Sequence, residues 1–396
     1  MRRVLYLAPY PPIRSGISDY AVRFKEAIEC SGEWSMDVVS LDGLVGNSLS
    51  DLSKVRQAVL GWRSASRIAG ADFVHAEIGY RQHAALYALR FLQRAVPDIP
   101  YCVTVHDPPL VIAPALFPLA LGTGSTLVRH ALRVLDHTPL GRTVIRRVLA
   151  RASQVFTLTR SGERALRQLL PGKSEVDYLP LVDMRAGIPA TEDFADADGP
   201  LRVLFLGFWG PGKGISTLLE AVQRLSDDGV PVRLLLGGEP DGSPASRRFS
   251  DKIVGRIRRS PLRSCVDLLG FVPPEEIDGV FDRSDVFAIP TTRSPGYSAS
   301  SVQFRAAAAG VPIVASDLPA FREHIVNMRT GLLVPAKDPA ALADALRLLA
   351  GDQRLRKRLG ESARGHVRRR HSPEVVAARV LPVYQRLAEE RADRRR

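Results

Sequence analysis

Short apolar runs alternate with longer amphipathic stretches along most of this chain. Runs rich in leucine and β-branched residues predict buried strands, whereas apolar residues spaced three or four positions apart, as in 17–29 and 80–95, predict helices. This alternation is typical of βαβ units and therefore of parallel sheets. The strands predicted for a first series lie at 4–7, 36–39, 73–75, 101–105, 155–158 and 176–178.

A second series of the same kind follows in the other half of the chain. The segment between the two series, 184–200, is rich in Ala, Asp, Gly and Pro, which is typical of a linker. The strands predicted for the second series lie at 202–206, 232–236, 266–269, 286–289, 313–315 and 331–334.

The two series predict an α/β protein in which two Rossmann-like, doubly wound domains face a central cleft. We expect an N-terminal domain over 1–183, a linker over 184–200 and a C-terminal domain over 201–371. A last helical pattern within 372–396 is expected to pack back on the first domain and ends in a basic tail. A chain of 396 residues is long enough for two such cores. Ligands of doubly wound sheets bind at the carboxyl ends of the strands, so the site is expected there.

Composition is that of an ordinary globular protein, with 45% hydrophobic residues, 24% charged residues and a mean hydropathy of −0.03. A formal net charge of +13 and a pI near 10.1 indicate attraction to polyanions. Phosphorylated small molecules, an anionic membrane surface and nucleic acid all qualify, and so does a solvated arginine-rich surface. No recognised module supports the nucleic-acid interpretation, so no nucleic-acid partner is expected.

The cysteines and acidic pairs give no metal or disulfide signal. The three cysteines are far apart and lack metal-ligand spacing, which fits a reducing cytoplasm. Asp196 and Asp198 form a DxD-like string, but they fall in the predicted linker and are expected to be solvated. The N-terminal apolar run is too short for a signal peptide, and the apolar run 110–121 is too short for a membrane span. We therefore expect a cytoplasmic protein without a metal cofactor.

Two small-residue turns that open helices are candidate phosphate sites. Ser15 and Gly16 follow the first predicted strand, and free backbone N–H groups at such a helix start suit an anion. An ordinary loop explains this turn equally well. The stronger signal is 207–214, where four glycines allow close backbone approach and Lys213 supplies a mobile charge for a diphosphate. This loop is neither a P-loop nor a GxGxxG fingerprint, which disfavours kinases and dehydrogenases.

A polar loop after the strand 286–289 opens a third helix. Ser300 or Ser301 is expected to cap this helix, which runs to Ala309. Its alanines also predict tight packing against a neighbouring element.

With these motifs in this order, the sequence resembles the retaining glycosyltransferases of family 4, whose two-Rossmann-domain architecture is called GT-B. The resemblance covers nearly the whole chain, and the order and spacing of the motifs are more specific than any one of them. It rests on Ser15-Gly16, 104–107, 207–214, 269–273, 284–287, 309–315 and 331–335.

The resemblance implies transfer of a sugar from a nucleotide donor with retained anomeric configuration, usually without a bound metal. Lys213 matches the lysine that neutralises the donor diphosphate, and Gly16 matches a glycine loop that approaches it from the opposite domain. His106 matches a histidine near the transferred sugar, although a hydrogen-bonded histidine at a strand end is the alternative. Catalytic roles are expected for His106 and Lys213. The other donor contacts that the resemblance implies are Ser15, Gly207, Gly212, Gly270, Phe271 and Val272.

The chain departs from the family pattern at three positions. Phe208 stands where the family usually has an arginine, and Tyr297 and Arg305 stand where it has two glutamates. Arg305 is expected either to meet the ribose hydroxyls as a donor or to contact phosphate. The serines expected to supply neutral contacts to the diphosphate or sugar are Ser298, Ser300 and Ser301.

The segment 110–152 combines an apolar run with several arginines. A basic amphipathic surface of this kind suits anionic headgroups or a lipid-linked saccharide, so peripheral attachment to the inner face of the plasma membrane is expected as one interpretation. The alternative is a set of helices with a solvated arginine face.

The sequence thus predicts a hexosyltransferase-type enzyme that moves a sugar from a nucleotide-sugar to a saccharide or lipid-linked acceptor with retention, in cell-surface glycan or glycoconjugate synthesis. Two alternatives remain. The missing glutamates favour a catalytically silent partner subunit of the same fold, whereas a nucleotide-sugar epimerase would need more carboxylates and histidines than the motifs contain.

Overall fold

The computed structural model describes residues 1–13, 15–40, 56–59, 61, 68, 70–79, 83–106, 108, 146–179, 199–240, 244–292 and 300–396. The chain divides into two compact units, which are described separately. Unit 1 contains Met1–Val182 together with Pro373–Arg396, and unit 2 contains Asp183–Ser294 together with Ser300–Ser372. The predicted linker lies outside the described residues except for 199–200.

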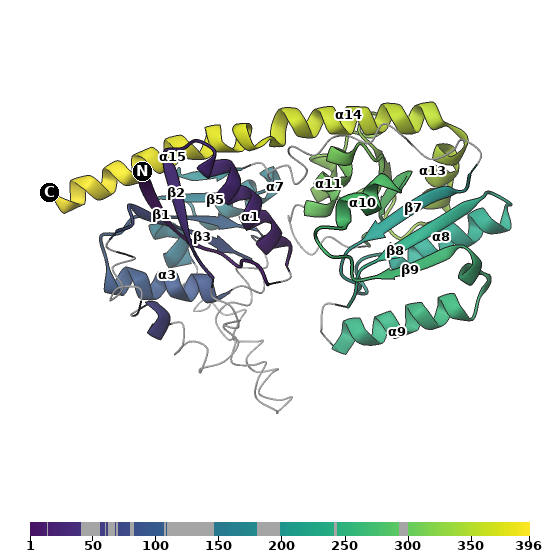
Figure 1. Cartoon of the computed structure of the whole chain (residues 1–396), viewed down its shortest axis with the longest axis horizontal. Coiled ribbons are helices and arrows are strands. Elements are labelled where there is room, and N and C mark those ends of the chain that lie inside the picture. Colours follow the sequence, from purple (N-terminus) through teal and green to yellow (C-terminus); the bar gives the residue numbers. More distant parts are fainter. Residues whose placement is uncertain are drawn as a thin grey trace. The chain divides into compact units, whose positions relative to one another are not determined.

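Unit 1 is built on a six-stranded parallel sheet in the order β2-β1-β3-β4-β5-β6 (Figure 1). All six strands predicted for the first series are confirmed, and β3 continues to Ile78 instead of ending at His75. The strands are β1 (Arg2–Leu7), β2 (Trp34–Val39), β3 (Phe73–Ile78), β4 (Tyr101–Val105), β5 (Gln154–Thr157) and β6 (Val176–Tyr178).

The two faces of this sheet have different characters, because successive strand residues point to opposite sides. Leu5 and Val74 belong to an apolar cluster that also contains Leu89 of α3. The alternate residues Tyr6 and His75 face the other side, where their rings contact Phe24 of α1. The helices of unit 1 are α1 (Gly16–Glu29), α3 (His83–Ala95), α7 (Arg160–Leu169) and α15 (Pro373–Arg395).

Unit 2 repeats the plan with a second six-stranded parallel sheet in the order β12-β11-β10-β7-β8-β9. All six strands predicted for the second series are confirmed, and Asp285 ties β10 to β7 through hydrogen bonds from the backbone and guanidinium of Arg202. The strands are β7 (Leu201–Leu206), β8 (Val232–Gly237), β9 (Val266–Gly270), β10 (Val286–Ile289), β11 (Ile313–Ser316) and β12 (Leu332–Val334).

Helices cover both faces of the second sheet, as expected for a doubly wound domain. On one face α8 and α13 pack together, and their leucines join those of β7 and β8 in one apolar cluster. Elsewhere in the unit α11 packs against α10 and α14. The helices are α8 (Ile215–Asp227), α9 (Pro244–Arg258), the 3₁₀ turn η2 (Pro261–Ser264), α10 (Ile277–Asp282), α11 (Ser301–Ala309), α12 (Pro319–Arg322), α13 (Pro339–Gly351) and α14 (Gln353–His371).

The C-terminal helix α15 completes the core of unit 1, where it packs against α1 (Figure 1). Its Tyr384 is fully buried, and the ring packs edge-on against Trp34 and Phe73. The Tyr384 hydroxyl also hydrogen-bonds Nδ1 of His75, which is itself fully buried. No helix among the described residues has both the length and the apolar character required to cross a membrane.

The Tyr384–His75 hydrogen bond is testable by Tyr384→Phe. Loss of the hydroxyl leaves Nδ1 of a buried imidazole without a partner, so the free energy of unfolding is expected to fall by about 1–3 kcal/mol. Urea unfolding measures the change, with Tyr10→Phe as a control at a partly exposed position. Equal stability of the two variants would contradict the role assigned to Tyr384.

Candidate functional site

The polar groups of unit 1 gather where its strand order reverses. From β1 the chain goes first to β2 on one side and then to β3 on the other, and ligands of doubly wound sheets bind at the carboxyl ends of the strands at such a point. Tyr6 lies near the carboxyl end of β1, and Glu77 lies near that of β3. His106 directly follows β4, and its backbone N–H bonds the carbonyl of Ile78.

Glu77 forms the centre of this cluster, although its side chain is 0% exposed. One carboxylate oxygen accepts from the Tyr6 hydroxyl at 2.7 Å, and the other lies 2.7 Å from Nε2 of His106. The His106 ring packs edge-on against Tyr20 of α1 at a centroid distance of 5.1 Å, and its side chain is 9% exposed. The structure therefore places the predicted catalytic histidine in a buried pair with a carboxylate.

His75 lies next to this cluster and hydrogen-bonds a residue outside it. Its Nε2 lies 2.7 Å from the Thr104 hydroxyl and 3.6 Å from a carboxylate oxygen of Glu77. Burial lowers the pKa of His75 to about 4, against a smaller opposing effect from Glu77. His75 is therefore neutral at physiological pH.

The Ser15-Gly16 turn is a capped helix start at the same end of the sheet. The Ser15 hydroxyl accepts from the backbone N–H of Ser18 at 3.0 Å, and Gly16 is the first residue of α1 itself. The hydroxyls of Ser18 and Tyr20 are buried without a hydrogen-bond partner among the described residues. The turn thus presents a helix N-terminus, which is the feature that favours anions.

In unit 2 the strand order reverses between β7 and β10, and the glycine-rich loop 207–214 begins directly after β7. Gly214 is left-handed, and a Cβ there would lie 1.7 Å from the carbonyl oxygen of Pro290. The carbonyl of Gly212 accepts from both the backbone N–H and the hydroxyl of Thr292. Loop 207–214 is therefore locked backbone to backbone against the segment that leaves β10.

The other side of loop 207–214 is held by glycines at the ends of β8 and β9. A Cβ on Gly238 would lie 1.9 Å from the carbonyl oxygen of Gly207, and the N–H of Gly238 bonds the carbonyl of Gly270. Trp209 anchors the loop, because its buried indole donates to the carbonyl of Gly237. Phe208 is 42% exposed, and after Gly270 the chain continues through the half-buried Phe271 to the buried Val272.

Lys213 is exposed at the tip of loop 207–214, where its backbone N–H closes a turn onto the carbonyl of Gly210. The next residue but one begins α8, so a charged side chain and a helix N-terminus are adjacent in sequence. An exposed ammonium beside a helix N-terminus is the arrangement that binds diphosphates.

Arg305 links α11 to the neighbouring helix α10 and the segment before it. The side chain is buried, and its guanidinium bonds the carboxylate of Asp278 and the carbonyl of Pro274. The bonds with described partners thus hold α11 against α10, and donor contact by Arg305 stays a prediction. Ser300 is the N-cap of α11 but makes no capping hydrogen bond with its side chain, and Ser301 is the first helical residue. Tyr297 and Ser298 lie outside the described residues.

Comparison with known proteins identifies the family. The family described as "Glycosyl transferases group 1" matches residues 200–352, and the "Glycosyl transferase 4-like domain" matches residues 22–181. The chain belongs to glycosyltransferase family 4. This family 4 chain is 34% identical over 220 residues to phosphatidyl-myo-inositol mannosyltransferase of Mycobacterium leprae, covering 55% of the chain and 53% of the relative. It is 32% identical over 207 residues to D-inositol 3-phosphate glycosyltransferase of Corynebacterium urealyticum, covering 50% and 47%.

Solved structures share the GT-B fold with this family 4 chain. Sucrose-phosphate synthase from Thermosynechococcus elongatus superposes with a TM-score of 0.72 at 18% identity, over 98% of the chain and 99% of that structure. Anabaena HepE in complex with UDP-glucose superposes with a TM-score of 0.67 at 15% identity, over 97% and 100%. The sequence matches are shorter than these superpositions and span about half the length of the curated relatives.

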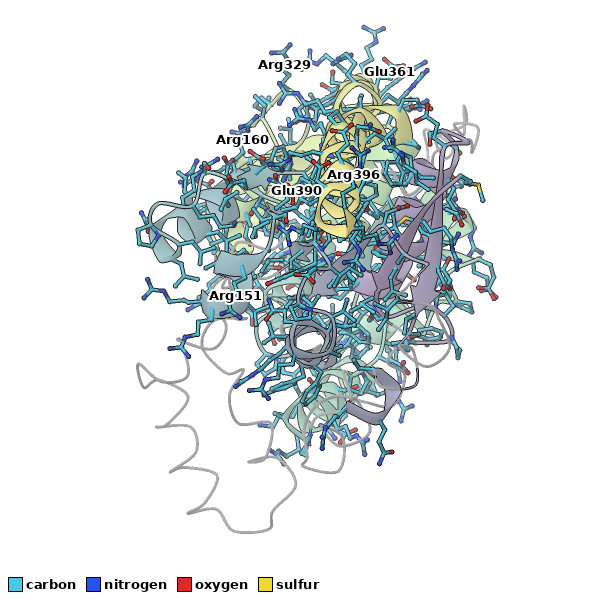
Figure 2. All side chains as sticks on the ribbon, turned by 90° about the vertical axis from the view of Figure 1, so that its left-hand side faces the viewer. Arg151, Arg160, Arg329, Glu361, Glu390 and Arg396 are labelled. Carbon is cyan, nitrogen blue, oxygen red and sulfur yellow. The ribbon has the colours of Figure 1, made fainter. Side chains whose placement is uncertain are left out.

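Sequence reasoning missed Glu77, Tyr6 and Asp278. The signal for Glu77 was a carboxylate inside an apolar run that predicts a buried strand, where a charge is costly unless it is paired. The described residues contain no group of three or more His, Cys, Asp or Glu side chains able to hold a metal. Most of the basic segment 110–152 lies outside the described residues, although Arg151 is exposed and points away from the ribbon (Figure 2).

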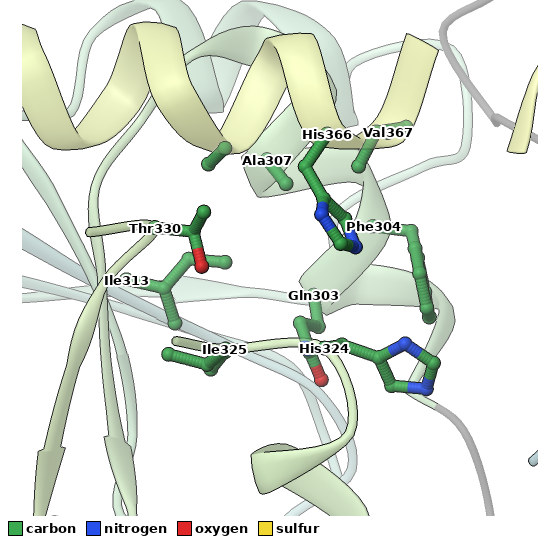
Figure 3. Close-up of a pocket in the computed structure, with 10 residues that line it drawn as sticks. Gln303, Phe304, Ala307, Ile313, His324, Ile325, Thr330, His366 and Val367 are labelled. Atoms are coloured by element: carbon green, nitrogen blue, oxygen red, sulfur yellow. The ribbon is translucent and has the colours of Figure 1, made fainter. Parts of the chain in front are cut away.

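Unit 2 also has a small pocket, whose wall includes Phe304 of α11 and His366 of α14 (Figure 3). Its wall includes Ile313, the first residue of β11, so it lies at the amino end of that strand, opposite the carboxyl end. Burial lowers the pKa of His324 in this wall to about 4, and its Nε2 has no hydrogen-bond partner in the described part of the chain.

The locked glycine is testable by Gly214→Ala, with Gly229→Ala as the matched control. Both glycines are left-handed, but a Cβ at Gly229 meets nothing within 4 Å. The control is expected to lose about 1–2 kcal/mol of unfolding free energy from backbone strain alone. Gly214→Ala adds a clash with Pro290 and is expected to lose about 3 kcal/mol or more. Similar losses in the two variants would show that the contact with Pro290 is not tight.

Proposed function

We propose that this family 4 chain is a retaining glycosyltransferase that moves a hexosyl group from a nucleotide-sugar to a saccharide or lipid-linked acceptor, in cell-surface glycan or glycoconjugate synthesis. The observation that carries the proposal is loop 207–214, which brings Lys213 and the N-terminus of α8 to the strand-order reversal of unit 2. Departure of a nucleoside diphosphate builds negative charge, and a cation beside free N–H groups stabilises that charge.

The donor chemistry proposed here needs no metal cofactor. Lys213 supplies the positive charge that a divalent cation would otherwise bring to the diphosphate, and the N–H groups at the start of α8 supply hydrogen bonds. The resemblance to family 4 supports a role for His106 at the transferred sugar. A lipid-linked acceptor is supported by the name of one relative, which refers to phosphatidyl-myo-inositol.

One observation favours the silent-subunit alternative. At the helix position that resembles the family's second glutamate, this chain places Arg305 in a buried pair with Asp278. A subunit that keeps the fold but binds no nucleotide would tolerate this change.

Calorimetric titration with UDP, GDP, ADP and dTDP in metal-free buffer at fixed salt separates the two readings. One nucleotide is expected to bind, and Lys213→Ala is expected to weaken binding at least about tenfold, because it removes a charge-assisted hydrogen bond. Lys252→Ala, an exposed lysine on α9, is the control and is expected to bind like the wild type. Failure of every nucleotide to bind would support the silent subunit, and NMR of the product anomer tests retention once a donor is found.

We also propose peripheral binding to an anionic membrane surface, supported by the exposed Arg146, Arg147 and Arg151 and by the net charge of +13. Co-sedimentation with liposomes that contain anionic lipid is expected at low salt and is expected to weaken steeply as salt rises. Liposomes of neutral lipid are the control. Equal sedimentation with both kinds of liposome, or none with either, would rule out electrostatic attachment.

A further inference from the structure

The buried pair of Glu77 and His106 assigns a direction to the histidine ring. A carboxylate has only acceptor oxygens, so Nε2 of His106 is the donor in the 2.7 Å contact. The second oxygen of Glu77 is occupied by the Tyr6 hydroxyl, which fixes the carboxylate in place. Nδ1 is therefore the ring nitrogen left for a ligand, and within the described residues it has no side-chain partner.

Charge balance then bears on the protonation of the ring. In the described part of the chain, the basic side chains within 4.0 Å of the Glu77 carboxylate are both histidines, His75 and His106. A carboxylate removed from water is costly unless a positive charge accompanies it. Burial lowers the pKa of His75 to about 4 and keeps that ring neutral, so His106, at 2.7 Å, is the described basic group left to pair with Glu77.

The other described groups that face His106 do not supply or remove charge. Tyr6 on β1 hydrogen-bonds Glu77, and Tyr20 on α1 packs against the His106 ring. Burial raises the pKa of both phenols, so both stay neutral at physiological pH. Glu77 and His75 on β3 are the other described titratable groups that interact with His106.

We infer that Glu77 is a positioning residue, which orients the His106 ring through Nε2 and keeps the ring protonated so that it presents a charged Nδ1–H to a substrate oxygen at the carboxyl end of β4. The inference rests on the proposed function for the identity of that oxygen, but not for the state of the ring. A charged donor binds an oxygen that gains negative charge about twice as strongly as a neutral donor does. The pair thus stabilises the transition state more than the ground state, which is the requirement for catalysis.

The first test is histidine-ring NMR of the full, nucleotide-free chain. The His106 signals are assigned by their loss in His106→Asn, and their titration is compared in the wild type and in Glu77→Gln, which keeps the shape of the side chain and removes its charge. In the wild type His106 is expected to hold its second proton to a pH at least one unit higher, a tenfold difference in proton affinity. Identical titrations would overturn the inference.

Asp285→Asn is the matched control, because Asp285 is another buried carboxylate but pairs with Arg202 in unit 2. This variant is expected to lose stability without moving the His106 titration. If Glu77→Gln fails to fold, the tautomer of His106 in the wild type provides the test. At a pH high enough for the His106 ring to be neutral, the ring is expected to keep its one proton on Nε2. A neutral ring protonated on Nδ1 would contradict the inference.

Kinetics give the second readout. With a donor found by nucleotide binding, Glu77→Gln is expected to lower kcat about tenfold or more and to leave KM for the donor within about twofold. The lost activity is expected to recover partly at lower pH, where the ring protonates without Glu77. A loss of stability with an unchanged kcat would show a purely structural role. Absence of nucleotide binding would reject the proposed function and leave the NMR test intact.

Discussion

The polar cluster of unit 1 is arranged around a carboxylate that is buried inside a parallel sheet. Glu77 is fully removed from solvent, and the cost of burying an unpaired carboxylate exceeds what any one hydrogen bond returns. Three polar side chains surround the carboxylate and offset this cost. They are Tyr6 on β1, His75 on β3, which also carries Glu77, and His106 directly after β4. Their side chains lie on one face because successive strand residues point to opposite faces. The register of the strands therefore determines which side chains meet at the site.

The two units prepare for ligands by different physical means. Unit 1 uses polar side chains that are buried from water, where hydrogen bonds such as that between Glu77 and His106 are strong and rigid. Unit 2 uses backbone, because the missing side chain of Gly238 leaves room for the carbonyl of Gly207, and its cation is the exposed Lys213. A histidine held by a carboxylate is suited to a single oxygen at a fixed place, whereas a helix N-terminus beside an exposed lysine is suited to a diphosphate.

The sequence predicted all twelve strands because a buried parallel strand is a local signal, an apolar run bounded by turn residues. Loop 207–214 was predictable for the same reason, since glycines and a lysine stand together in the chain. Glu77 was not, because its partners are 71 and 29 residues away and only the sheet register brings them together. The pairing of Arg305 likewise depends on how α10 packs against α11, which no local pattern encodes.

The C-terminal helix α15 also contributes to unit 1 through contacts with residues that are far away in the sequence. Val376, Val380, Tyr384 and Leu387 of α15 are fully buried, and each such side chain contributes about 1.5–3 kcal/mol on burial. Their sum is comparable to the whole stability of an ordinary domain, about 5–15 kcal/mol. The same helix gives His75 its second hydrogen-bond partner, and His75 lies beside Glu77. The first 182 residues therefore do not make up the whole of unit 1. Its core and the polar cluster around His106 both depend on α15, which follows unit 2 in the sequence.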